Sequence, residues 1–80
     1  MAIMTKSQAK KLIEQPDKML DVLNYLVEKK VISADEHRAT MLKGFSKLVT
    51  VLQEKKVINA KGAKAAMQGG FASLLETISA

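Results

Sequence analysis

Apolar side chains recur every three or four residues along most of the chain, which is the spacing of an amphipathic helix. Four helices are predicted, over residues 6–15, 16–30, 34–56 and 60–79. The side chains expected to face inward are Ala9, Leu12, Ile13, Met19, Leu20, Leu23, Leu26, Val27, Met41, Leu42, Phe45, Leu48, Val49, Leu52, Ala63, Met67, Phe71, Leu74 and Ile78. No strand pattern competes with the helical period, so the pattern predicts an all-α fold.

Polar residues mark where these helices begin. Thr5 with Gln8 and Ser33 with Glu36 have the capping-box spacing, in which two side chains satisfy free backbone N–H groups. Asn59 stands at the same place before the last helix. Gly44 falls in the middle of the 34–56 segment, where glycine either bends or breaks a helix or lets another helix approach closely.

Part of the pattern returns after 26 residues. Residues 28–32 (EKKVI) are identical to residues 54–58. The residues Met41, Gly44 and Phe45 return as Met67, Gly70 and Phe71. A period this short indicates one supersecondary unit used twice. We therefore predict a single domain over residues 1–80. It is a compact bundle of four helices, or five if the third breaks at Gly44, built from two related hairpins, with Phe45 and Phe71 at equivalent buried positions.

One stretch resembles a known family. Leu23, Leu26, Ile32, Ser33 and Glu36, within residues 23–42, resemble the SHOCT short helical hairpin of bacterial proteins. That hairpin usually carries Gly where Lys30 stands and an aromatic residue where His37 stands. The resemblance implies a helical hairpin and, through the family's association with oligomerisation, self-association; it implies no activity.

The size of the chain limits its stability. At 80 residues, a domain buries only about 60% of its unfolded surface, and small domains usually add disulfides, metals or oligomerisation. The chain has no Cys, which excludes disulfides and thiolate metal sites. Oligomerisation remains as a possible source of additional stability. The small residues Gly62, Ala66 and Gly70 predict a close helix contact, either within the chain or between two copies.

The net charge of +5 is unevenly distributed. Residues 1–40 contain seven basic and six acidic residues, whereas residues 41–80 contain six basic and two acidic residues. The asymmetry favours an acidic partner for the second half, and a lysine-rich surface that only maintains solubility is the alternative. With no apolar run of membrane-spanning length and no secretory signal, we expect a cytoplasmic protein that does not engage membranes.

No residues predict catalysis, a cofactor or a metal site. His37 is the only histidine, and no nucleophile or orienting carboxylate is placed to face it. Glu14, Asp17 and Asp21 do not by themselves define an acid–base or metal site. Gly69 and Gly70 lack the context of a phosphate-binding loop. The protein is expected not to be an enzyme.

Lysines are the candidates for an interaction surface. The six are Lys29, Lys30, Lys55, Lys56, Lys61 and Lys64. If the two units stack, these side chains form a basic strip that could track phosphates. Because no aromatic residue and no Arg accompany them, any nucleic-acid binding would be electrostatic and non-specific. The alternative is that the doublets only stabilise helix C-termini.

These observations favour a small non-enzymatic interaction module that binds a protein partner, itself, or both. Small basic helical proteins of bacteria and phages often act by binding and blocking or by assembling, an association that rests on fold class alone. The alternative is a non-specific nucleic-acid-binding protein that uses the basic C-terminal half.

Overall fold

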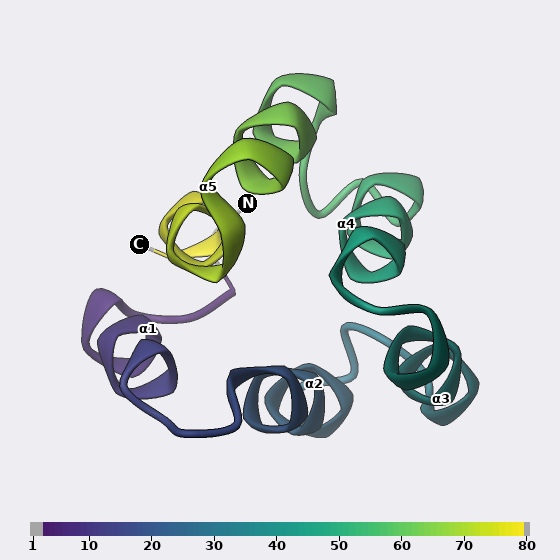
Figure 1. Ribbon diagram of the computed structural model, residues 1–80, viewed down its shortest axis with the longest axis horizontal. Helices are drawn as coiled ribbons and strands as arrows, with labels where there is room; N and C mark the ends of the chain where they lie inside the picture. The colour runs from purple at the N-terminus through teal and green to yellow at the C-terminus, as the bar shows by residue number, and fades with distance from the viewer. Residues whose placement is uncertain (1–2, 80) are drawn as a thin grey trace.

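The computed structural model describes residues 3–79 and is all-α, as predicted. Its helices are α1 (Lys6–Ile13), α2 (Lys18–Glu28), α3 (Ala34–Lys43), α4 (Phe45–Glu54) and α5 (Ala60–Ile78). Each helix packs against the next, and α5 also packs against α1, so the five helices close into a ring (Figure 1). Of the two predicted possibilities, four helices or five if the third breaks at Gly44, the described structure therefore has five.

The predicted polar residues cap the helix starts, but of the two predicted capping boxes the described structure contains both hydrogen bonds only for Ser33 with Glu36. Ser33 forms a complete capping box: its hydroxyl accepts from the Glu36 N–H at 3.1 Å, and Glu36 accepts from the Ser33 N–H at 2.8 Å. Thr5 and Asn59 cap α1 and α5 by accepting backbone N–H groups three residues on. Asp17 caps α2 in the same way, which places the start of that helix two residues after the expected Pro16.

Two glycines interrupt the helices. Gly44 has φ +94° and separates α3 from α4; Gly70 has φ +75° and kinks α5. The expectation of an uninterrupted helix over residues 60–79 is therefore wrong at Gly70. A Cβ atom built at either glycine would meet nothing within 4 Å. The left-handed backbone, rather than crowding, is what requires glycine at these positions.

Left-handed residues also end α2 and α4, but these are lysines. Lys30 has φ 61° and Lys56 has φ 63°. After α2, the Val31 N–H donates to the Leu26 carbonyl at 2.8 Å, and the Lys30 N–H donates to Val27 at 3.0 Å. These two hydrogen bonds together form the Schellman motif, which satisfies the last carbonyls of a helix. The same pair of hydrogen bonds follows α4, from Val57 to Leu52 and from Lys56 to Gln53.

The ring has two distinct ends, which we name by their connections. The turn end carries the turn at residues 14–17 together with Gly44 and Gly70, and it faces the viewer in Figure 1. The link end carries the links at residues 29–33 and 55–59 and both ends of the described chain. There the Ile3 N–H donates to the Ile78 carbonyl at 2.8 Å, and Met4 pairs with Ser79 in a short β-bridge.

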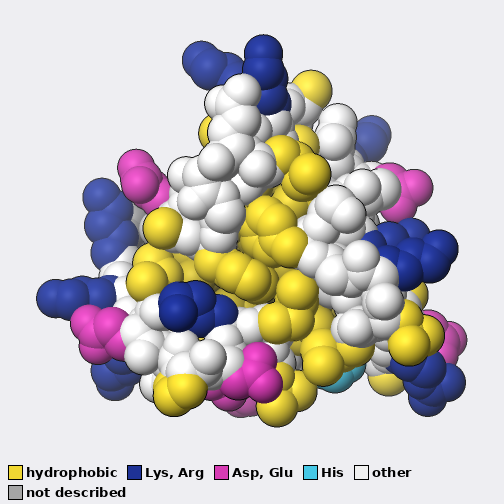
Figure 2. All heavy atoms as spheres, in the orientation of Figure 1, with side chains coloured by type: hydrophobic (Ala, Val, Ile, Leu, Met, Phe, Trp, Pro, Cys, Tyr) yellow, Lys and Arg dark blue, Asp and Glu magenta, His cyan; other side chains and the backbone are white. Residues whose placement is uncertain are grey.

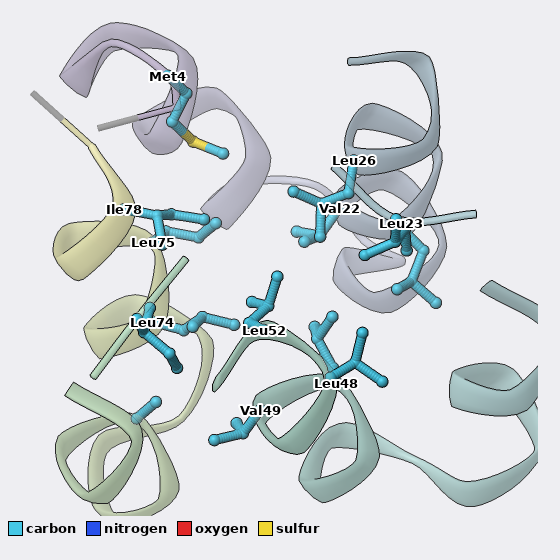
Figure 3. Close-up of a cluster of buried hydrophobic side chains, with 14 of the residues drawn as sticks. Met4, Val22, Leu23, Leu26, Leu48, Val49, Leu52, Leu74, Leu75 and Ile78 are labelled. Atoms are coloured by element: carbon cyan, nitrogen blue, oxygen red, sulfur yellow. The ribbon is translucent and has the colours of Figure 1, made fainter. Parts of the chain in front are cut away.

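The core lies inside the ring. Figure 3 shows side chains of α2, α4 and the second half of α5 directed toward a common centre, with Met4 beside them. The labelled members are Met4, Val22, Leu23, Leu26, Leu48, Val49, Leu52, Leu74, Leu75 and Ile78, all buried. Leu23, Leu26, Leu48, Leu52, Leu74 and Ile78 confirm the expected inward positions.

Four expected core residues lie outside instead. Leu20, Met41, Leu42 and Met67 are 37%, 46%, 82% and 54% exposed. For the last three the reason is geometric. The prediction assumes one continuous helical period across Gly44 and Gly70, but the chain leaves the helix at these glycines, so different positions face inward before and after them. Phe45 and Phe71 are half-buried rather than fully buried, and their rings contact each other with centroids 4.5 Å apart.

Candidate interaction surfaces

The candidate lysines belong mainly to the link end. Lys29 and Lys30 follow α2, Lys55 and Lys56 follow α4, and Lys61 lies in the first turn of α5. Lys64, the sixth, lies one helical turn further along α5. All six are exposed. The alternation of helix directions thus brings both doublets to one end of the ring.

Two of these lysines already make contacts within the molecule. The Lys55 ammonium lies 2.9 Å from the Glu36 carboxylate, which joins the end of α4 to the start of α3. The Lys29 ammonium lies 5.6 Å from the centre of the Tyr25 ring. The hydrogen bond from the Ser33 backbone and the ion pair with Lys55 lower the pKa of Glu36 below its ordinary value. Lys55 and Glu36 thus contribute to helix capping as well as to surface charge.

A second surface was not predicted from the sequence: large apolar residues are exposed near the connections of the turn end, where charged residues such as Glu14, Asp17 and Lys43 are exposed too. The four exposed large hydrophobic residues of the described chain all lie within one helical turn of a connection at this end. They are Leu20 after the 14–17 turn, Met41 and Leu42 before Gly44, and Met67 before Gly70. Figure 2 shows hydrophobic atoms continuing across the middle of this face, with basic and acidic side chains close to one another around the rim and one basic side chain nearer the middle.

Half-buried residues connect this surface to the core. Met19, Phe45 and Phe71 pack against the buried cluster and come immediately after the connections of the turn end. The Phe45–Phe71 contact places two aromatic rings where α4 begins and α5 resumes. A signal for this surface was present in the sequence, because a Met–x–x–Gly–Phe pattern occurs twice and glycine ends helices.

His37 and the acidic residues were the candidates for a catalytic or metal site. The His37 Nε2 atom lies 3.0 Å from the Asn24 amide oxygen, so its neighbour is an amide and not a carboxylate or nucleophile. No group of three or more His, Asp or Glu residues within residues 3–79 could hold a metal ion. A groove of about 520 Å³ between α1 and α5 is lined by Lys6, Lys10, Glu14 and Glu76 together with small and apolar residues.

None of the five helices, over the residues that the structure describes, has the length and apolarity required to cross a bilayer. No family model, curated protein or solved structure was found to match the chain. The resemblance of residues 23–42 to the SHOCT hairpin is therefore not supported by a family match, and no function is taken from it.

Proposed function

We propose that the protein is a small non-enzymatic interaction module that binds a protein partner through its turn end. The observation that carries this proposal is the position of Leu20, Met41, Leu42 and Met67, all exposed and all at one end of the ring. Single exposed apolar residues are common on protein surfaces, but a group of them on one face is typical of an interaction site. Methionine side chains adapt their shape to a partner, which suits such a site.

We also propose that the 26-residue spacing reflects two related helical hairpins. Its support is local: Lys30 and Lys56, like Gly44 and Gly70, have left-handed backbones at the same spacing. The repeat would explain why two ends with different chemistry arise, since each unit contributes the same residues to the same end.

Capture from a lysate of the organism that encodes the protein tests the proposed function. The protein is immobilised, the lysate is treated with nuclease, and bound proteins are compared between the wild type and the variant Leu42→Ser/Met67→Ser. We expect a protein that survives nuclease treatment and is lost from the variant. Equal capture by both would contradict binding at the turn end, and sedimentation of the purified protein would reveal self-association as the alternative use.

The alternative function is non-specific nucleic-acid binding at the link end. It is favoured by the presence of both lysine doublets at that end, with Lys30 and Lys56 in conformations that glycine adopts more easily. Titration with random-sequence duplex DNA at low salt tests it. If Lys55, Lys56, Lys61 and Lys64 contact phosphates, affinity falls with salt with a slope of about 0.9 per contact, and replacing all four with Gln abolishes binding. Absence of binding at about 50 μM protein, a concentration within the usual range of non-specific affinities, would remove this alternative.

A further inference from the structure

We infer that residues 3–5 take the place of a third link in the ring, and that α1 opens there as a hinged arm while the other helices stay folded. Two connections of the link end, at residues 29–33 and 55–59, run through the chain itself. The third connection, between α5 and α1, is made by non-covalent contacts of residues 3 and 4 with residues 78 and 79. The inference is independent of the use proposed for the turn end.

The contacts of residues 3–5 repeat those of the two links. In each link, a backbone N–H donates to the carbonyl of a buried leucine of the preceding helix, at 2.8 Å from Val31 and 2.9 Å from Val57. At the junction, the Ile3 N–H donates to the carbonyl of the buried Ile78 at 2.8 Å. The next residue is buried at all three places: Ile32, Ile58 and Met4. The residue after it caps the following helix: Ser33, Asn59 and Thr5.

Buried positions before these contacts also recur in threes. The spacing of 26 residues relates three buried residues of α2 to three of α4 and to three in the second half of α5. They are Val22, Leu23 and Leu26; Leu48, Val49 and Leu52; and Leu74, Leu75 and Ile78. The two halves of α5 lie against each other, since a Cβ atom at Gly62 would be 3.1 Å from the Thr77 Cγ2 atom. The ring thus divides into three hairpins, and residues 3–5 stand where the third link belongs.

The chain and polar contacts hold α1 less firmly than they hold α3. The chain continues from α3 into a link at one end and Gly44 at the other. The Lys55–Glu36 ion pair and the hydrogen-bond contact of His37 with Asn24 attach α3 further. In contrast, the chain joins α1 to another helix only through the turn at residues 14–17. The one ion pair within residues 3–79 does not involve α1.

The packing of α1 is also loose on both sides. A groove of about 520 Å³ lies along its contact with α5, and one of about 340 Å³ lies along its contact with α2. The helix fully buries only Ala9 and Leu12. The Tyr25 hydroxyl donates to the Ile3 carbonyl at 3.4 Å, which is long for a hydrogen bond. Few contacts therefore oppose a local opening, which the conformational entropy of the released segment favours.

Amide hydrogen exchange of the wild-type protein, followed by NMR, tests the opening. Three matched N–H groups, of Ala9, His37 and Ala63, each donate to the carbonyl of the residue that caps their helix, at 3.0, 2.9 and 2.8 Å. We expect the protection factor of Ala9 to be about tenfold or more below the other two, with a weaker dependence on urea, because a local opening exposes little surface. Equal protection and equal urea dependence of the three would overturn the inference.

Covalent closure tests the place of the opening. Joining the two ends of the chain by a peptide bond would put four residues (79, 80, 1 and 2) between Ile78 and Ile3. As many residues separate the bonded pairs of the two links (27–30 and 53–56). We expect the joined chain to fold and the protection factor of Ala9 to rise to that of His37. If Ala9 exchanged as fast as in the wild type, opening at this junction would be refuted.

A circular permutant tests whether the three connections are equivalent. The joined chain is reopened between Glu54 and Lys55, which lies 26 residues before its original ends (80 − 54 = 26). We expect an unchanged far-UV circular dichroism spectrum, with Ala63 now the least protected of the three amides and Ala9 protected. A permutant without helical structure, or one in which Ala9 remains the least protected, would overturn the equivalence.

Discussion

Thr40 offers a sharp test of the packing described above. It is fully buried in α3, and within the described part of the chain its hydroxyl oxygen has no hydrogen-bond partner. The other helical threonines behave differently: the hydroxyl of Thr50 donates to the Ser46 carbonyl at 3.0 Å, and that of Thr77 donates to Ser73 at 2.9 Å. Thr40 thus carries a desolvated hydroxyl without compensation.

The variant Thr40→Val removes that hydroxyl and nearly preserves the shape of the side chain. An unsatisfied buried hydroxyl costs about 1–3 kcal/mol, while Thr and Val have similar helix propensities. We expect the free energy of unfolding to rise by about 1–2 kcal/mol, which for a domain of this size raises Tm by about 4–8 °C per kcal/mol.

Urea unfolding followed by circular dichroism measures this change. With a slope of about 1 kcal/mol per molar urea for so small a protein, the midpoint should rise by about 1–2 M at constant slope. Thr50→Val is the matched control, because its hydroxyl is exposed and bonded to the backbone; its effect should stay within about 0.5 kcal/mol. Destabilisation by Thr40→Val would show that the hydroxyl has a partner in solution and would refute the reasoning.

Three further predictions concern the contact between the two phenylalanines, the left-handed backbone at Lys30 and the ion pair of Glu36. In a double-mutant cycle, Phe45→Ala and Phe71→Ala should each cost about 2–3 kcal/mol, since each ring is half-buried, with a coupling of about 0.5–1.5 kcal/mol from the ring contact; additive effects would contradict that contact. Lys30→Gly should raise the free energy of unfolding by about 0.5–1 kcal/mol, because glycine adopts the left-handed conformation freely; a loss would show that the lysine itself stabilises the link. The lowered pKa of Glu36 means that its carboxylate stabilises the fold above the ordinary pKa of 4.5 and that this stabilisation is lost as pH falls through the lower folded pKa. Glu36→Gln should therefore flatten the acid limb of a stability–pH profile, and parallel profiles for the variant and the wild type would argue against the pair with Lys55.

Local signals in the sequence were sufficient for the starts of α1, α3 and α5. Ser33, Asn59 and Thr5 cap helices as expected because an N-cap depends on a few adjacent residues. Core positions such as Leu23, Leu26, Leu48 and Leu52 could be predicted equally well, since each lies within an unbroken helix with a regular period of apolar residues.

The turn end could not be predicted in the same way. A helix can kink at a glycine or continue through it without a change of direction. Which of the two happens at Gly70 depends on packing between the two halves of α5, and the periodicity of the sequence does not contain that information. Counting through the glycines placed Met41, Leu42 and Met67 inside. The candidate lysines were identified from their spacing, but their placement at one end of the ring depends on the direction of every helix.

The contact between the two ends of the described chain also shapes how the protein folds. Ile3 and Ile78 are hydrogen-bonded across a sequence separation of 75 residues (78 − 3), whereas the paired Schellman hydrogen bonds after α2 and α4 span three and five residues. The neighbours of α2, α3 and α4 are close in sequence, so most of the ring can form through fast local contacts. Closing it requires one long loop closure between α1 and α5, whose entropic cost grows slowly with length. During synthesis α1 must wait for α5, so the ring closes only when the last helix has emerged.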